Sequence, residues 1–167
     1  MELCDIYDEH RQLTGRIHAR GAPLREGEYR LIVHVWIQND EGQYLVSKRT
    51  PNKSSPNQWE CTGGGAVAGE DSLTAALREV KEELGIELDP NAGWLVREIK
   101  GDNAFVDVWL FRQDVDLADI VFHPRETCDA KWVNEAEIIA MMRDYSFVWQ
   151  FSFGYMDKLF AFARRCD

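Results

Sequence analysis

Three glutamates, Glu79, Glu82 and Glu83, stand three and four positions apart in a stretch with helical spacing. On a helical wheel of about 100° per residue they share one side, opposite an apolar stripe. Like charges this close destabilise a helix by roughly 0.2–0.5 kcal/mol per pair, and these lie near its negative end. One explanation is an ordinary solvated face. The other is a ligand set, because clustered carboxylates suit a hard divalent cation such as Mg²⁺ or Mn²⁺.

The helix that carries these acids has recognisable ends. It is expected to begin near Asp71 or Ser72, either of which can cap it, and to end at Gly85. Its apolar stripe should face the core and leave the acids on the accessible side; the stripe comprises Leu73, Leu77, Val80 and Leu84. The run from Gly63 to Gly65 is interpreted as a turn whose carbonyls can approach a ligand without interference from a Cβ. Helix and turn together predict an all-oxygen cation site.

The segments around this helix alternate between strand and helix patterns. A β-branched run from Arg30 to Ile37 predicts a strand buried on both faces. Further strands are expected over residues 43–49, 59–62, 95–100, 104–113 and 131–133, and further helices over 135–142 and 151–165. The order predicts strands and helices mixed around a mostly β core.

The composition limits the possible partners. The 167 residues include 19 Lys and Arg against 29 Asp and Glu, a formal charge of −10. This balance argues against nucleic-acid polymers, because binding a phosphate backbone depends on clustered basic side chains. The longest apolar stretch, Leu31 to Ile37, is far short of the roughly 20 residues that span a bilayer. The acidic amino terminus lacks a secretory pattern and the four cysteines are scattered, so a cytoplasmic location is expected.

The spacing of the helix acids also resembles a family signature. Nine specified positions over 23 residues are similar to the complete Nudix box of the Nudix hydrolases: Gly64-x5-Glu70-x7-Arg78-Glu79-Val80-x-Glu82-Glu83-x-Gly85-Ile86. A strand pair and a Trp before the box, and Glu126 to Trp132 after it, agree with the family pattern over residues 28–142. More loosely, Cys4-Asp-Ile-Tyr-Asp-Glu and the stretch from Gly27 to Ile37 resemble the subgroup related to isopentenyl-diphosphate isomerase.

This resemblance implies an α/β fold, an α/β/α sandwich around a mixed β-sheet. It also implies Mg²⁺-dependent hydrolysis of a diphosphate linkage, typically in a nucleoside diphosphate joined to another group. The implied metal ligands, which help to activate the attacking water, are Glu79, Glu82, Glu83 and the carbonyl of Gly63. Arg78 and Glu70 match the pair that orients the catalytic helix.

The general base varies among members of the family, from a box glutamate to a glutamate in a later loop. Glu126 is the candidate in this chain and Asp129 a weaker neighbour, with a solvated loop acid as the alternative. Three basic residues, Lys48, Arg49 and Lys53, are candidates for contacts with substrate phosphates, or else serve surface solubility.

Aromatic and histidine side chains are weaker candidates. Trp36, Trp59 and Trp109 are able to stack on a base, although six Trp in one compact domain more often belong to the core. His34 and His123 are expected to be hydrogen-bonded structural histidines rather than ligands or bases.

The chain is expected to form one domain over residues 1–167. Its core would span 28–142, with an N-terminal strand extension over 1–27 and a C-terminal helix over about 151–165. This length buries roughly 70% of the surface that the unfolded chain exposes, enough for a single core. The aromatic segment from Tyr145 to Phe162 is a candidate surface for a homodimer.

Two other functions compete with hydrolysis. An isopentenyl-diphosphate isomerase needs a Cys in the glycine-rich segment and His metal ligands, whereas this chain has Gly63 or Gly64 there and Cys61 lies two to three residues early. A non-catalytic nucleotide-binding Nudix module would commonly lose box carboxylates, which are complete here. The prediction is therefore a pyrophosphohydrolase that uses Mg²⁺ or Mn²⁺ and acts on a small-molecule diphosphate, without a membrane partner.

Overall fold

A computed structural model describes residues 2–148 and 154–165. Seven strands form the main sheet: β3 (Arg30–Gln38), β4 (Tyr44–Arg49), β5 (Trp59–Glu60), β6 (Thr62–Gly65), β7 (Gly93–Lys100), β8 (Ala104–Arg112) and β9 (Thr127–Val133). The order is β5-β4-β3-β8-β7, while β6 pairs with β3 and β9 pairs with β4. Because β3 and β8 run parallel and the other pairs antiparallel, the sheet is mixed, as predicted.

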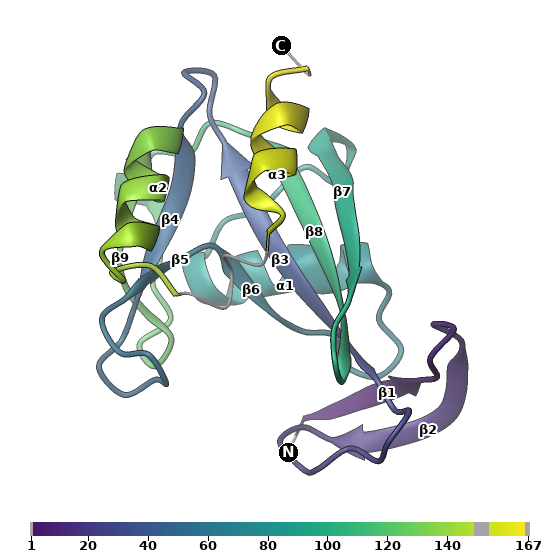
Figure 1. The fold of residues 1–167 in the computed structure, drawn as a ribbon. Helices are drawn as coiled ribbons and strands as arrows, with labels where there is room; N and C mark the ends of the chain where they lie inside the picture. Colours follow the sequence, from purple (N-terminus) through teal and green to yellow (C-terminus); the bar gives the residue numbers. More distant parts are fainter. Residues whose placement is uncertain (1, 149–153, 166–167) are drawn as a thin grey trace.

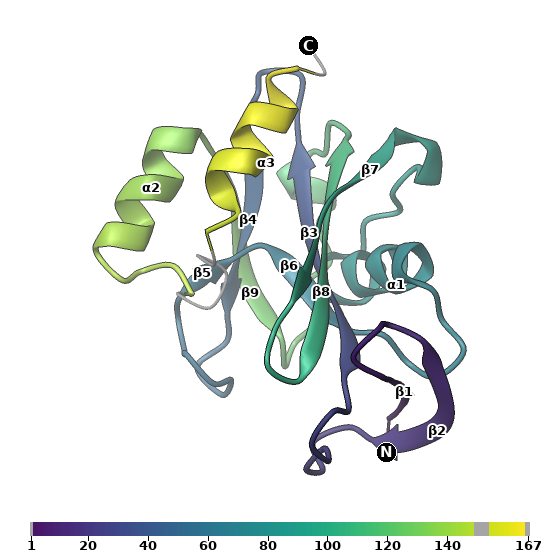
Figure 2. The same cartoon turned by 45° about the vertical axis from the view of Figure 1, so that its right-hand side comes forward.

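Helices cover both faces of this sheet (Figures 1 and 2). On one face, α1 (Ser72–Leu84) packs Val80 and Leu84 against Val33 of β3. On the other face, α2 (Glu135–Arg143) and α3 (Met156–Ala163) pack Ile138 and Leu159 against Trp36. Successive β3 side chains thus point into opposite apolar cores, which is why this strand is apolar almost throughout. The α/β/α sandwich is confirmed.

The N-terminal residues form a separate two-stranded sheet of β1 (Leu3–Tyr7) and β2 (Leu13–Ala19), at one end of the main sheet in Figure 1. Two 3₁₀ turns, Pro90–Ala92 and Leu117–Asp119, complete the described elements. The hairpin is tied to the main body through an isolated bridge between Tyr7 and Tyr29. The guanidinium of Arg11 also contacts the fully buried Asp107 of β8 at 2.6 Å.

Both predicted ends of the acidic helix are confirmed. The side chain of Asp71 accepts a hydrogen bond from the Thr74 N–H at 2.8 Å, which caps the N-terminus of α1. Gly85 takes the left-handed conformation with φ of 72°, and its N–H donates to the Lys81 carbonyl. A residue with a Cβ is disfavoured in that conformation, so the glycine terminates the helix.

Three boundaries differ from the predictions. The run from Gly63 to Gly65 is part of strand β6 and not a turn, because it pairs with β3 in a regular antiparallel register. Strand β9 begins at Thr127 rather than 131, since β4 offers a full-length edge for pairing. Helix α3 begins at Met156 and ends at Ala163; residues 151–153 of the predicted helix lie outside the described residues.

The predicted dimer segment contributes to the core of its own chain. Phe147, Tyr155 and Phe160 are buried against α2 and the sheet, while Tyr145 is exposed. The homodimer remains a prediction. In the part of the chain that the structure describes, no helix is long and apolar enough to cross a membrane.

Candidate active site

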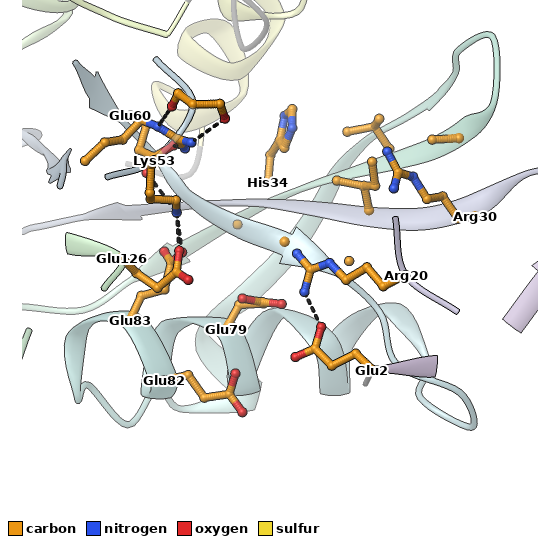
Figure 3. A pocket seen from close by; sticks show the side chains of 18 of the residues that line it. Glu2, Arg20, Arg30, His34, Lys53, Glu60, Glu79, Glu82, Glu83 and Glu126 are labelled. Carbon is orange, nitrogen blue, oxygen red and sulfur yellow. Dashed lines mark hydrogen bonds and ion pairs between the residues drawn. The ribbon is translucent and has the colours of Figure 1, made fainter. Parts of the chain in front are cut away.

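A cavity of about 1030 Å³ opens between strands β3 and β6 of the main sheet, helix α1 and the N-terminal hairpin. Figure 3 shows Glu79 of α1 on the side of the helix that faces the sheet, with His34 across the cavity. The glycines of β6 also line the cavity. Residues from the loops at 50–58 and 120–127 close one end, and Arg20 and Arg30 line the other. The structure therefore brings most of the predicted site residues into one cavity.

The three helix glutamates do not share one environment. Glu79 and Glu83 are buried, with 6% and 5% of their surface exposed, whereas Glu82 is exposed. The expectation that all three lie on an accessible face was wrong. Ala75 and Ala76 are the reason: these small buried side chains let α1 approach the sheet closely, so the buried face extends to the two glutamates.

Burial changes the acidity of these carboxylates. It raises the pKa of Glu83 to about 8, because desolvation disfavours the charged form. It also raises the pKa of Glu79, against the lowering effect of the neighbouring Arg78 guanidinium. Glu60 on β5 is a third buried acid whose pKa burial raises, and it lies close enough to Glu83 to raise that pKa further. Three buried acids at one end of the cavity are unfavourable without a cation.

Two glycines of β6 bring the backbone next to these acids. A Cβ on Gly64 would lie inside van der Waals contact with the Glu79 carboxylate, 2.6 Å from its Oε2. A Cβ on Gly63 would collide with the Val33 carbonyl of β3 and lie 3.3 Å from the His34 Cα. Gly63 therefore permits close strand pairing, and Gly64 makes room for the glutamate.

Arg78 and Glu70 form the predicted pair. The guanidinium donates to Glu70 Oε1 at 2.7 Å and Oε2 at 3.0 Å, and also to the Gly65 carbonyl at 3.0 Å. Glu70 in turn accepts from the Val67 N–H at 3.0 Å. The pair thus joins α1 to the end of β6 and to the loop between them, which fixes the helix relative to the glycine strand. Arg78 also contacts Glu79 and Glu82, each at 3.0 Å.

Glu126 reaches the cavity because its loop is fixed to the end of α1. The His123 N–H and the Thr127 hydroxyl both donate to the Glu83 carbonyl, at 3.0 and 2.7 Å. That carbonyl has no partner within the helix, so the loop satisfies a group that every helix end leaves open. Asp129 lies on β9 outside the residues that line the cavity, which favours Glu126 as the loop acid.

Lys53 stands where several carboxylates converge. Its ammonium forms an ion pair with Glu126 and lies 3.7 Å from Glu83 Oε1 and 3.9 Å from Glu60 Oε1. It was predicted as a phosphate contact, and its position in the cavity is compatible with that. In this structure it neutralises acids instead.

The donor set fits a hard divalent cation. Glu83 Oε2 and Glu60 Oε1 are buried and have no hydrogen-bond partner among the described residues. Within the same residues no three acidic, His or Cys side chains already surround one point. Lys53 instead pairs with Glu83 and Glu126, and Arg78 pairs with Glu79. A cation that replaced Lys53 would gain carboxylate oxygens that now lack full hydrogen bonding.

Of the other residues predicted to contact the substrate, only Arg49 lines the cavity. Arg49 lines the cavity but is buried in an ion pair with Glu60 at 2.5 Å, which makes it a positioning group for that acid. Lys48 is outside the cavity, over the ring of Trp59 at 5.6 Å. Trp36, Trp59 and Trp109 are likewise absent from its lining, and Trp36 and Trp109 pack in the two cores.

Both histidines line the cavity and have hydrogen bonds, as predicted. His34 is 5% exposed, and its Nδ1 lies 3.1 Å from the Tyr155 hydroxyl. Burial lowers the pKa of His34 to about 3, so its ring is neutral at physiological pH. His123 accepts a hydrogen bond at Nδ1 from the Arg125 N–H at 3.3 Å.

Sequence reasoning missed six charged residues of the cavity: Glu2, Arg20, Arg30, Glu60, Asp102 and Arg125. Glu60 gave one available signal, an acid in a short strand next to the buried Cys61. Arg20 and Arg30 carry no motif, and only the folding of the hairpin against the sheet brings them to the site.

Comparisons with known proteins agree with this geometry. The NUDIX domain model matches residues 28–152. An uncharacterised Nudix hydrolase of Listeria monocytogenes is 38% identical over 162 residues, which cover 96% of this chain and 94% of the relative. An RNA pyrophosphohydrolase of Rhodospirillum rubrum is 40% identical over 145 residues, covering 75% and 82%. A crystal structure from Deinococcus radiodurans has the same fold, with a TM-score of 0.72, 23% identity and coverage of 86% and 90%.

The chain therefore belongs to the Nudix family, whose members generally use divalent metals. Within that family it is a hydrolase of phosphorus-containing anhydrides.

Proposed function

We propose that this protein is a Mg²⁺-dependent pyrophosphohydrolase that cleaves a diphosphate linkage in a small molecule, such as a nucleoside diphosphate joined to another group. One observation carries the proposal: Glu83 and Glu79 are buried side by side against the glycine strand, and a Glu83 oxygen lacks any hydrogen-bond partner among the described residues. Carboxylates buried this close together repel one another, and a cation between them offsets that repulsion. Mn²⁺ is the alternative metal.

The chain's own residues divide the work. Glu79, Glu82 and Glu83, with the Gly63 carbonyl, would hold the metal, which neutralises diphosphate oxygens and makes bound water more acidic. Arg78 and Glu70 keep these ligands in place through the contacts to Gly65. Glu126 is the proposed general base, since its loop places it beside Glu83 across the Lys53 ammonium.

Cavity chemistry favours hydrolysis over isomerisation. The relation to the isopentenyl-diphosphate isomerase subgroup rests on two stretches only, the one that begins at Cys4 and the one from Gly27 to Ile37. The thiol nearest the glycine strand, Cys61, is fully buried and does not line the cavity, and burial raises its pKa well above the ordinary value. A non-catalytic binding module is disfavoured because all the box carboxylates are present. A cytoplasmic location, inferred from the scattered thiols, belongs to the same proposal.

The proposal is tested with a hydrolysis screen in Mg²⁺ and in Mn²⁺, with chromatographic identification of the products. The panel contains nucleoside triphosphates, ADP-ribose, dinucleoside polyphosphates, sugar nucleotides, CoA and prenyl diphosphates. RNA with a 5′-triphosphate and isopentenyl diphosphate are included to test the two other substrate classes. Cleavage of a small diphosphate supports the proposal. Formation of an allylic isomer, cleavage of RNA alone, or binding without any cleavage would overturn it.

The role of Glu126 is tested separately with Glu126→Gln. If Glu126 takes the proton of the attacking water, this variant loses kcat by a factor on the order of 10²–10⁴. Asp129→Asn serves as the matched control, because Asp129 is an acid of the same region outside the cavity. Unchanged kcat in Glu126→Gln would assign the base to a box glutamate.

A further inference from the structure

The two ends of the cavity differ in their charged groups: acids predominate at one end, whereas two arginines stand with Glu2 and Asp102 at the other. Figure 3 shows Glu60, Lys53 and Glu126 at one end and Arg20 and Arg30 at the other, with His34 between them. The first end contains most of the acids and is the proposed metal end. The second end contains two guanidinium groups from segments that precede the box, one after β2 and one at the start of β3.

Arg30 is a cation without an ion-pair partner among the described residues. Its backbone is fixed, because Arg30 is the first residue of β3 and its N–H donates to the Asn103 carbonyl at 3.2 Å. Its side chain has no ion pair within the described residues, and its Nε is buried without a hydrogen bond. A buried N–H donor without an acceptor costs free energy, and a charged group without a counter-ion favours an anion beside it.

Arg20 is held in place by the N-terminal hairpin, which also contacts the loop between β6 and α1. Its guanidinium pairs with Glu2, and its N–H donates to the Glu2 carbonyl at 2.9 Å. The same hairpin holds the loop before α1: the Gly69 N–H donates to Asp5 Oδ2 at 2.7 Å, and the Ala68 N–H donates to the Leu3 carbonyl at 2.8 Å. The arginine end therefore keeps a fixed position relative to the catalytic helix.

The walls between the arginines and the turn at 101–103 are aliphatic. They consist of Ile32, Ile99, Ala104 and Val106. Among the described residues, no Trp, Tyr or Phe lines the cavity. These walls therefore offer no aromatic ring for base stacking, and the two arginines are the positively charged groups at this end.

We propose that Arg20 and Arg30 bind a second anionic group of the substrate, a phosphate or carboxylate that lies beyond the metal-held diphosphate oxygens. The inference rests on the proposed function for the metal end, but its own evidence is that Arg30 has no ion pair among the described residues and that its buried Nε has no hydrogen bond. Guanidinium groups bind such anions through paired N–H donors. The N-terminal hairpin is then a specificity element of the active site, and a substrate whose distal group is neutral leaves Arg30 unpaired.

A metal-free binding experiment tests this independently of catalysis. Inorganic pyrophosphate is titrated in EDTA into the full-length protein, and arginine side-chain Nε–Hε resonances are followed by NMR. Without metal the carboxylates disfavour an anion at the other end, and the part of the binding that depends on Arg30 reports on the arginine end. Arg30→Gln should weaken the affinity roughly 10-fold to 100-fold, and Arg30→Lys should restore part of it as a point charge.

Arg97→Gln is the matched control, because Arg97 is an exposed arginine of β7 outside the cavity and its loss changes the net charge equally. A urea melt of each variant shows that the fold is retained. Equal pyrophosphate affinity in wild type and Arg30→Gln, or no saturable binding in wild type, would overturn the inference. Loss of affinity confined to the Arg30 variants supports it.

Steady-state kinetics of Arg30→Gln show which substrate group the arginine binds. They also distinguish failure of the proposed hydrolysis from failure of the anion site. For a hydrolysed substrate, Arg30→Gln should raise KM with little change in kcat when the distal group is a phosphate or carboxylate. It should leave KM unchanged for the analogue that lacks this group. If no compound is hydrolysed while pyrophosphate binding still depends on Arg30, the proposed hydrolysis fails and the anion site stands.

Discussion

Replacing Gly64 by alanine should remove catalysis without unfolding the protein. The added methyl group would lie 2.6 Å from Glu79 Oε2 and closer still to Oε1, whereas ordinary contact begins at 3.4 Å, so the carboxylate must move by more than about 0.8 Å. Displacements near 1 Å in a catalytic group cost on the order of 10²-fold in rate. We expect kcat to fall by about that factor.

The effect on stability should be small. Gly64 is not in the left-handed region, and the atoms that it would meet belong to the end of a flexible side chain. Alanine also restricts the unfolded chain more than glycine does. The free energy of unfolding in urea should therefore change by less than about 1 kcal/mol.

Gly63→Ala is the contrasting variant one position earlier. There the methyl group meets the Val33 carbonyl and the backbone of His34, which cannot move without separating β6 from β3. Crowding of this kind costs about 1–3 kcal/mol. The reasoning is refuted if Gly64→Ala keeps wild-type kcat and metal affinity, or if Gly64→Ala loses as much stability as Gly63→Ala.

Three further predictions concern the charged groups. Glu82→Gln and Glu83→Gln should each lower kcat by orders of magnitude with the fold intact, as measured by steady-state kinetics and circular dichroism; near wild-type turnover in both would contradict their assignment as ligands. Lys53→Met should tighten Mg²⁺ binding in calorimetry, because the ammonium now competes for Glu83 and Glu126; weaker binding would show that Lys53 supports the site. Glu70→Gln should cost about 1 kcal/mol of stability at pH 7, since solvent screens this partly exposed pair. Burial raises the pKa of Glu70, but the hydrogen bonds from Arg78 and the Val67 N–H outweigh it, so the pKa lies below its ordinary value of 4.5. That contribution is complete above pH 4.5 and disappears as the pH falls through the folded pKa, so urea melts of wild type and Glu70→Gln should converge in acid.

The arrangement of charges around α1 explains why the acidic helix folds. Arg78 bridges Glu70 to Glu79, and Lys53 neutralises Glu83 from a distant loop. The helix therefore does not depend on a cation for its structure, although its buried carboxylates favour one. This separation lets a ligand variant lose activity while it keeps the fold.

Sequence alone determined the local features of this protein. The cap at Asp71, the glycine at position 85 and the spacing of the three glutamates predicted α1 and its chemistry, because caps and side-chain periodicity act over a few residues. The β-branched run at 30–37 likewise predicted a strand buried on both faces. These signals depend only on residues close together in the chain, so they can be interpreted without knowing which other segments pack against them.

Only the tertiary structure decided which carboxylates are buried and which cations face them. The small side chains of Ala75 and Ala76 let α1 lie close to the sheet, so Glu79 and Glu83 are buried. The apolar stripe had placed these glutamates on the exposed face of the helix. Arg20 and Arg30 enter the cavity because the hairpin folds back on the loop before α1. Burial and charge pairing depend on contacts between segments far apart in the chain, and the spacing of residues within one segment does not contain that information.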